Sequence, residues 1–504
     1  MKQSSNTPIG HRIADLRETE GLTQTALAKK IGSTQSAIAR IEAGKQNVSA
    51  DMLKKIGEAL HRNLLTAIPG SMNVEISGGK KLHGTIVTNT SKNGAVGLLC
   101  ASLLNRGTTI LHRVPRIEEV HRIIEVMESI GVSVRWEGTS LYINPPRKFN
   151  LDTIDIEAAC RTRSIVMFIG PLLRHLKKFS LPQSGGCKLG NRTVRPHFFA
   201  LEPFGVTITA QENNFSITHT PKQPDEVILY ESGDTVTENI LFTAASTPKT
   251  VIIKYASANY MVQEVCHFLQ ALGVVVDGIG TTTLQITGCA DINCDIEYTL
   301  SEDPTDSMFF ITAALLTQSE LTIQRCPIDF LELELLKLEK MGMRYRKSQP
   351  YLSTNQNTRL VDLIIKPSKL TALEEKIYAR PYPGLNIDNL PFFAVIATQA
   401  HGQTLIHDWV YEKRAIYFTE LDKLGAETVL ADPHRIFITG PTPLRSVELV
   451  CPPALRPATI ILLAMLAASG KSLLRNIYSI NRGYEGLVTR LQSLGADIDY
   501  APEF

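Results

Sequence analysis

The chain has 504 residues, of which 43% are hydrophobic and 20% are charged, and its formal net charge is +2. This length exceeds what one hydrophobic core supports, so several domains are expected, and the balanced charge excludes a global attraction to nucleic acid or membrane. The polar start MKQSSNTPIG has no secretory apolar core. The most apolar run, PATIILLAMLAASG, is too short to span a bilayer and predicts a buried helix.

The eight cysteines are scattered along the chain without a Cys-x-x-Cys pair. Their spacing is typical neither of a zinc site nor of a small disulfide framework. We therefore expect a reduced, cytoplasmic protein that needs no metal and no organic cofactor.

The first 66 residues carry ten Lys or Arg and six Asp or Glu residues, a local net charge of +4. Apolar residues recur there at helical spacing in four sets, which predicts a small all-α domain. The four sets are Ile13 and Leu16, Leu27 and Ile31, Ile38 and Ile41, and Leu53 with Ile56 and Leu60. Thr23 and Ser33 are predicted to cap two consecutive helices that are separated at Gly32.

The stretch LTQTALAKKIG, followed by SAIARIE, resembles the Cro/repressor family of helix-turn-helix domains. The resemblance implies that the second helix of the pair enters the major groove of DNA, and that two copies bind two half-sites as a dimer. The residues expected at the DNA are Thr34, Gln35, Ser36 and Arg40 on that helix, with Gln24 and Lys45 near phosphates. A helical bundle that binds protein is the alternative interpretation.

From residue 73 onward the sequence repeats, and each repeat has two recognisable phrases. One phrase is a segment ending in Gly-x-hydrophobic, with glycines at positions 131, 205, 273, 342, 425 and 495. The other precedes it by about two dozen residues and reads GTTILHR, KKFSLPQ, KTVIIKY, SELTIQR, GQTLIHD and GKSLLRN. In each repeat, an apolar segment precedes the GTTILHR-type phrase. An amphipathic segment then separates that phrase from the glycine phrase. The pattern therefore predicts the same order of elements in each unit: a helix, a strand, a second helix, a turn at the glycine, and a second strand. Six units pack most naturally as two lobes of three.

Six α/β units in two lobes are the plan of the enolpyruvyl transferases, an α+β fold of inside-out, barrel-like lobes. The motifs SKNGAV, RTRSIVMFIGPLL, SGGCKLGNR, EDPTDSMFFITAA, YEKRAI and INRGYEGLVTRLQSLGADI resemble that family, most closely its UDP-N-acetylglucosamine 1-carboxyvinyltransferase branch. The resemblance implies a helix-turn-helix domain at 1–66, a linker at 67–72, lobe I at 92–299, and lobe II at 73–91 with 300–504.

Enolpyruvyl transferases add an acceptor hydroxyl to C2 of phosphoenolpyruvate and a proton to C3, and then eliminate phosphate. The multiply charged donor requires several fixed cations, and the guanidinium fork of arginine suits phosphate and carboxylate oxygens. The residues that match the family's cationic positions are Lys92, Arg163, Arg192 and Arg414, and Asn93 follows the lysine in the same motif.

Two acid–base groups are needed as well. The resemblance assigns Asp303 to the carboxylate that faces the acceptor hydroxyl, with Glu302 and Asp306 as alternatives in the same segment. Asp388 matches a second carboxylate near the reacting centre, and a helix cap is its alternative interpretation. Cys187 lies in the glycine-rich loop, where the resemblance implies a proton donor toward C3 and a site of covalent attachment.

The chain departs from the family where the nucleotide is expected. Arg195 stands where an aspartate is usual near the uracil, and Glu231 stands where a lysine often faces the diphosphate. We therefore expect intact donor chemistry on a nucleotide-sugar-like acceptor, as in peptidoglycan precursor synthesis, or on a different nucleotide or sugar. The third hypothesis is a transcriptional regulator whose lobes sense a ligand. UDP-N-acetylglucosamine is predicted to be a poor acceptor, with the alternative that Lys188 of the loop or Arg161 reaches the diphosphate and restores its binding.

Overall fold

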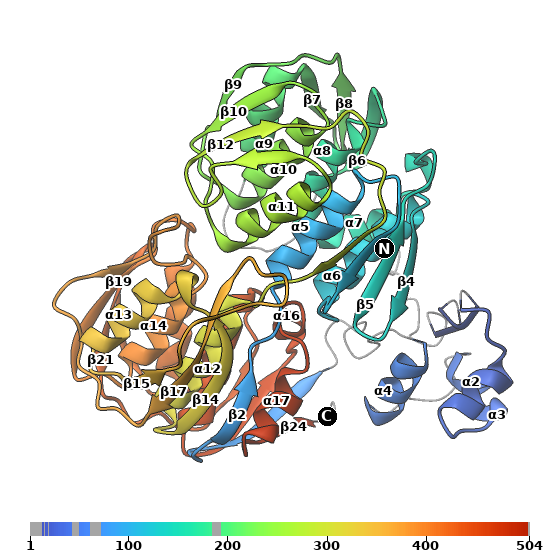
Figure 1. Cartoon of the computed structure of the whole chain (residues 1–504). Helices are drawn as coiled ribbons and strands as arrows, with labels where there is room; N and C mark the ends of the chain where they lie inside the picture. The colour runs from blue at the N-terminus through green and yellow to red at the C-terminus, as the bar shows by residue number, and fades with distance from the viewer. Residues whose placement is uncertain are drawn as a thin grey trace.

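The computed structural model describes residues 13–14, 16–18, 20–42, 50–60, 72–183 and 193–501. Two lobes and a small N-terminal helical domain make up these residues (Figure 1). One core cluster gathers buried residues between Ala95 and Leu300, and the other gathers residues from Val74 to Ile86 and from Met308 to Ile498. The first cluster is the core of lobe I and the second is the core of lobe II.

Lobe I contains three small sheets. In spatial order they are β13 (Ile296–Thr299), β3 (Thr109–His112), β5 (Ser140–Asn144) and β4 (Ser133–Glu137); β6 (Lys178–Pro182), β8 (Asn214–His219) and β7 (Val206–Ala210); and β11 (Val275–Asp277), β12 (Thr283–Thr287), β10 (Thr250–Lys254) and β9 (Glu226–Ile228).

Lobe II repeats this plan with strands from both ends of the chain. Its sheets are β22 (Glu448–Val450), β23 (Gly470–Arg475), β1 (Asn73–Gly78) and β24 (Asp497–Ala501); β15 (Arg344–Lys347), β17 (Arg359–Lys366), β14 (Glu320–Pro327) and β2 (His83–Val87), with β16 (Tyr351–Leu352) on β17; and β18 (Ile377–Tyr378), β19 (Gly402–His407), β21 (Arg435–Gly440) and β20 (Glu427–Asp432). The two-lobed α+β fold class predicted from the repeats is thereby confirmed.

The six repeat glycines perform the same task in every unit. All six have φ between 83° and 102°, a left-handed conformation that costs glycine no Cβ clash. Each ends a helical segment and is followed within two residues by a strand, as glycine C-caps commonly are. The second phrase of each repeat forms the strand that opens the unit, namely β3, β6, β10, β14, β19 and β23.

Apolar helices fill the inside of each lobe and the sheets lie outside them (Figure 1). In lobe II, every residue of α12 (Pro304–Leu316) and α14 (Leu390–Ala397) is buried, and α15 (Leu455–Ala467) is the predicted apolar helix. The other lobe II helices are α13 (Glu332–Lys340), η6 (Ala415–Leu424), α16 (Tyr478–Asn481) and α17 (Leu487–Ser493). Lobe I has α5 (Lys92–Ser102), α6 (Glu118–Ser129), α7 (Ile156–Arg161), η3 (Arg163–Phe168), α8 (Ile169–Leu172), α9 (Arg195–Leu201), α10 (Asp234–Ala245) and α11 (Tyr260–Ala271).

The N-terminal domain packs α2 (Gln24–Lys30), α3 (Gln35–Glu42) and α4 (Ala50–Ala59) around a separate cluster of apolar side chains. Thr23 caps α2 as predicted, since its side chain accepts a hydrogen bond from the Ala26 amide. The prediction for Ser33 is wrong by one residue. The Thr34 hydroxyl accepts from the Ala37 amide at 3.2 Å, because α3 begins at Gln35 and its cap must directly precede it.

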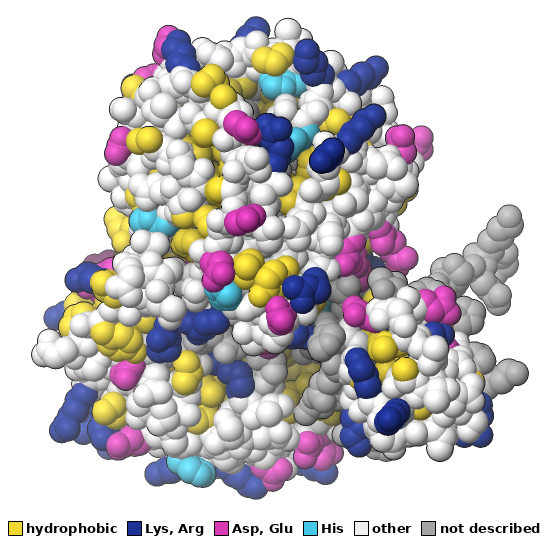
Figure 2. All heavy atoms as spheres, turned by 45° about the vertical axis from the view of Figure 1, so that its right-hand side comes forward, with side chains coloured by type: hydrophobic (Ala, Val, Ile, Leu, Met, Phe, Trp, Pro, Cys, Tyr) yellow, Lys and Arg dark blue, Asp and Glu magenta, His cyan; other side chains and the backbone are white. Residues whose placement is uncertain are grey.

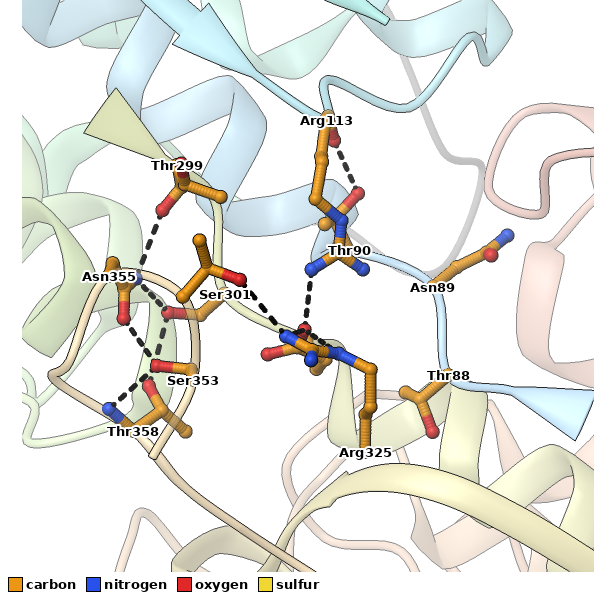
Figure 3. A network of polar contacts seen from close by, with 12 residues as sticks. Thr88, Asn89, Thr90, Arg113, Thr299, Ser301, Arg325, Ser353, Asn355 and Thr358 are labelled. Carbon is orange, nitrogen blue, oxygen red and sulfur yellow. Dashed lines mark hydrogen bonds and ion pairs between the residues drawn. The ribbon is translucent and has the colours of Figure 1, made fainter. Parts of the chain in front are cut away.

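The chain crosses between the lobes twice, and the two crossing segments lie side by side (Figure 3). Thr90 and Glu302 form an isolated antiparallel bridge there. The fully buried Glu302 carboxylate accepts from Arg113 of lobe I at 2.6 Å and from Arg325 of lobe II at 2.6 and 2.8 Å, all on Oε1. One carboxylate therefore holds both lobes at the point where they join.

Candidate active site

Two neighbouring cavities open between the lobes, and residues of both lobes line them. The larger has a volume of about 670 Å³ and the smaller about 290 Å³. They share a wall that includes Arg163, Glu231, Asn386 and Tyr411. Figure 2 shows acidic and hydrophobic side chains together on one face where the lobes meet.

Five cationic side chains converge on the smaller cavity. Three of them, Lys92, Arg163 and Arg414, were predicted from sequence, and the structure brings them to one wall although they come from three distant segments. Arg456 and Arg482 were missed. The signal for Arg456 was a charged residue at the start of an otherwise apolar helix, where burial is costly without a polar cavity beside it.

Lys92 begins α5, directly after the Ser91 side chain that caps the helix through the Gly94 amide. Its ammonium lies 3.4 Å from Oε2 of Glu119, which also accepts from Arg482 at 3.1 Å. Burial alone would raise the pKa of Glu119, but Lys92 and Arg482 outweigh it and lower the pKa to about 2. This carboxylate stays ionised and holds two cations at the rim of the cavity.

Asp388 faces the same cavity. Its carboxylate accepts from Arg456 at 3.0 Å, and Arg456 also donates to the Tyr484 hydroxyl at 2.8 Å. Burial would raise the pKa of Asp388, but Arg456, together with Arg414 and Lys92, lowers it to about 2. The helix-cap interpretation is wrong, because Asn389 occupies the position before α14 and the Asp388 carboxylate bonds to Arg456.

Arg414 lines the cavity but is completely buried. Its guanidinium forms an ion pair with Asp408, donates to the Ile387 carbonyl at 2.8 Å, and lies 4.4 Å from the centre of the Tyr411 ring. Arg163 donates to the Thr193 carbonyl at 2.9 Å. Asn93 also lines the cavity, and its side-chain amide donates a hydrogen bond of 3.3 Å to the Tyr260 hydroxyl.

The three carboxylates around residue 303 have different surroundings. Asp303 caps α12 through the Thr305 amide and hydroxyl at 2.8 and 2.6 Å, and it lines neither of the two cavities. Burial raises the pKa of Asp303 above its ordinary value, against the lowering effect of Arg456. Glu302 holds the crossing segments, and Asp306 accepts from Arg490 at 2.7 and 2.8 Å.

The structure also brings a buried glutamate to the smaller cavity, which sequence reasoning missed. Glu238 of α10 is buried, and its Oε1 has no hydrogen-bond partner among the described residues. Burial, with Asp234 and Glu264 nearby, raises its pKa well above the ordinary value. The Cβ that any other residue would have at Gly97 of α5 lies only 3.2 Å from this oxygen. The available signal was the motif TENI, which places a glutamate inside an otherwise mostly uncharged helical segment.

The remaining predicted site residues divide into two groups. Cys187, Arg192 and Lys45 lie outside the described residues, so their predicted roles stay predictions. Of the two departures from the family, Glu231 lines both cavities, whereas Arg195 is exposed at the start of α9 and lines neither.

The helix-turn-helix surface is held by polar contacts between its helices. Arg17 pairs with the buried Glu42 at 2.6 Å, and Gln24 donates to Glu42 at 2.8 Å. Gln35 in turn donates to Gln24 at 2.7 Å, which ties the first residues of α2 and α3 together. The predicted contact residues Thr34, Gln35, Ser36 and Arg40 are all exposed along α3.

Comparisons with known proteins agree with this architecture. A family described as EPSP synthase (3-phosphoshikimate 1-carboxyvinyltransferase) matches residues 76–491, and a helix-turn-helix family matches residues 13–65. The chain therefore belongs to the enolpyruvyl transferase family and carries a helix-turn-helix domain at its N-terminal end.

Individual relatives are similar to this chain along almost their whole length. The chain is 32% identical over 425 residues to UDP-N-acetylglucosamine 1-carboxyvinyltransferase of Treponema denticola, which covers 84% of this chain and 98% of that protein. It is 31% identical over 432 residues to the protein of the same name from Bradyrhizobium diazoefficiens, with 85% and 98% covered. The solved structure of the enolpyruvyl transferase NikO from Streptomyces tendae matches with a TM-score of 0.75 at 22% identity, covering 86% of this chain and 100% of that one.

Within the described part of the chain, no helix combines the length and the apolar character that a membrane-spanning segment requires.

Proposed function

We propose that the chain transfers the enolpyruvyl group of phosphoenolpyruvate to a hydroxyl of a nucleotide or nucleotide-sugar acceptor, with release of phosphate. The observation that carries the proposal is the convergence of Lys92, Arg163, Arg414, Arg456 and Arg482 on one small cavity in an enolpyruvyl transferase fold. Several fixed cations around one cavity favour a compact, multiply charged anion.

In the proposed reaction, the acceptor oxygen bonds to C2 and a proton is placed on C3. The bond from C2 to the phosphate oxygen then breaks, and C3 gives up a proton as the double bond forms again. Asp388 is the proposed base for the acceptor hydroxyl, because its carboxylate faces the smaller cavity, whereas Asp303 lines neither cavity and caps α12. Cys187 remains the proposed proton donor toward C3.

Phosphate release from phosphoenolpyruvate, measured with a panel of acceptors, tests the proposal. UDP-N-acetylglucosamine is the first member of the panel, because relatives bear its name, and turnover of it would place the protein in peptidoglycan precursor synthesis. Phosphate should appear only when an accepted hydroxyl compound is present, and Cys187→Ser should slow its release. A protein that releases no phosphate with any nucleotide or nucleotide sugar would contradict the proposal.

The N-terminal domain is proposed to bind duplex DNA as a dimer, which adds control of transcription to the transferase. The support is the exposed α3 surface and the net charge of +4 over residues 1–66. Affinity of the full chain should fall as salt rises, and Arg40→Ala should weaken binding about tenfold and alter sequence preference. Fluorescence anisotropy with genomic fragments measures this, and failure to bind any fragment at low salt would contradict it.

A regulator that only senses a ligand through its lobes is the second candidate, favoured by the helix-turn-helix domain itself. It predicts that phosphoenolpyruvate shifts DNA affinity although no phosphate is released. The acceptor panel, run beside the anisotropy measurement, separates the two functions.

A further inference from the structure

Aromatic side chains from both lobes line the larger cavity. Tyr230 and Tyr255 come from lobe I, and Tyr382, Trp409 and Tyr411 come from lobe II. Tyr230 is 73% exposed, Tyr255 57% and Trp409 48%. Large exposed aromatic surface costs hydration free energy, so a group of such rings around one cavity marks a place where apolar surface of a ligand is covered.

These rings are held in place rather than left loose. The Trp409 indole donates to the Ala379 carbonyl at 2.7 Å, which fixes one edge of the ring while about half of the residue stays exposed. Tyr230 packs on Phe199 with 5.4 Å between ring centres. Tyr255 has φ of 63°, a left-handed conformation that is uncommon and costly for a residue with a Cβ. Fixed rings on both lobes are suited to stacking on a planar group between them.

The charges of the same cavity disfavour an anion. Six carboxylate residues line it, and only two cationic residues, Arg163 and Arg380, do so among the described residues. Of the six, Asp329 is paired with Arg359, whereas Glu231, Glu332 and Glu412 have no ion-pair partner in the part of the chain that the structure describes. A diphosphate placed beside such carboxylates meets like-charge repulsion in a partly desolvated cleft.

We propose that the acceptor presents a planar aromatic ring, of the nucleobase kind, to Trp409 on one lobe and to Tyr230 and Tyr255 on the other, and that it carries no diphosphate. Neutral or cationic polar groups of the acceptor face Glu231 and Glu412. Because Tyr411 lines both cavities, an acceptor held here reaches the smaller cavity with its hydroxyl. The inference rests on the proposed function, whose acceptor class it narrows.

The chain offers a direct optical test, because it has only two tryptophans. Trp136 is buried in lobe I beneath Arg116, and Trp409 lines the cavity. In a Trp136→Phe background, fluorescence therefore reports on Trp409 alone. The probes are uridine, UMP and UDP, with adenosine and its phosphates as a second series, so that the ring is constant while the phosphates increase.

A nucleoside of at least one series should quench Trp409 fluorescence, and affinity should fall about tenfold from the nucleoside to its diphosphate. Glu231→Gln with Glu412→Gln should improve diphosphate binding and leave nucleoside binding within twofold. By calorimetry, Trp409→Leu should bind the nucleoside at least tenfold more weakly. Tyr351→Leu, an exposed aromatic residue that lines neither cavity, is the matched control and should bind it normally.

Absence of quenching by every probe, or diphosphate binding tenfold tighter than nucleoside binding, would overturn the inference. Binding is measured without turnover, so the two proposals fail separately. Quenching without phosphate release under any condition would count against the transferase reaction only. Phosphate release with UDP-N-acetylglucosamine, in the absence of quenching, would count against the aromatic site only.

Discussion

The two cavities share a wall and differ in what they attract. Five cationic side chains line the smaller cavity, where Glu119 and Asp388 are ionised and paired with those cations, and Glu231, Asp234 and Glu238 line it as well. Among the described residues, the larger cavity is lined by two cationic residues, six carboxylate residues and a set of exposed rings. In the proposed assignment, ion pairs organise the donor side, and the acceptor side presents ring faces together with Glu231, Glu332 and Glu412, which have no ion pair within the described residues.

This difference shows how one cleft can preserve a reaction while its acceptor changes. The donor is a compact anion, so its cavity depends on fixed cations whose geometry tolerates little alteration. The acceptor contributes a hydroxyl to the chemistry, and the rest of it needs only a complementary surface. Glu231 alters the surface that the two cavities share, while the ion pairs of Glu119 and Asp388 in the proposed donor cavity remain in place.

The largest effect is expected at the carboxylate that faces the donor cavity. Asp388→Asn keeps the shape and an oxygen acceptor for Arg456 but removes the base, so kcat should fall roughly a thousandfold with little change in phosphoenolpyruvate affinity. Steady-state kinetics and donor titration measure the two separately. Asp432→Asn, which alters an exposed ion pair with Arg435, is the control. If kcat falls less than tenfold, Asp388 is not the base, and Asp303 becomes the candidate again.

A loss of several hundredfold in kcat/KM is expected for Lys92→Ala. The variant removes a cation from the donor cavity and leaves Glu119, whose side chain is only 9% exposed, with one cation fewer. Lys80→Ala, at an exposed pair with Asp497, should change nothing. Full activity of Lys92→Ala would show that phosphoenolpyruvate does not bind among these cations. The smaller cavity would then not be the donor site.

Acid should lower the free energy of unfolding of the protein, because Glu119 becomes protonated and its ion pairs are lost. Its folded pKa of about 2 lies below its ordinary value of 4.5, so the unfolded state binds more protons between these pH values. The stability that the ion pairs contribute is therefore present above pH 4.5 and is lost as pH falls toward 2, by up to about 3 kcal/mol. Urea unfolding as a function of pH measures this. Glu119→Gln should be less stable at pH 7 but less sensitive to acid, and an unchanged slope would contradict the assignment.

The smallest effects are expected on the acceptor side. Glu231→Lys should improve UDP-N-acetylglucosamine affinity about tenfold, because a cation replaces a carboxylate that lines both cavities. Arg195→Asp should change it by less than twofold, because Arg195 lines neither. The comparison of the pair by calorimetry sharpens the distinction between the two departures. If the unmodified protein binds UDP-N-acetylglucosamine with micromolar affinity, neither Glu231 nor Arg195 governs the choice of acceptor.

Much of the fold could be predicted because its signals are local. The six glycines at 131, 205, 273, 342, 425 and 495 each end a helical segment in the left-handed conformation, and this requirement appears in the sequence wherever the unit recurs. The apolar run at the C-terminal end becomes α15 because a helix buried on all sides needs no polar face. The sequence-based prediction placed the cap of α3 one residue too early. Ser33 and Thr34 both carry a hydroxyl, and only the start of the helix decides which of them is the cap.

Within the site, the sequence by itself predicted that Lys92, Arg163 and Arg414 share one cleft, the proposed donor site, and all three line the smaller cavity. Only the tertiary structure decided which carboxylates face it. Glu302, Asp303 and Asp306 are neighbours in the chain, yet one holds the crossing segments, one caps α12, and one pairs with Arg490. The partners that direct these side chains come from positions up to 189 residues away. The same holds for the rings of the larger cavity, because stacking surfaces are assembled by packing between lobes and leave no periodic trace along the chain.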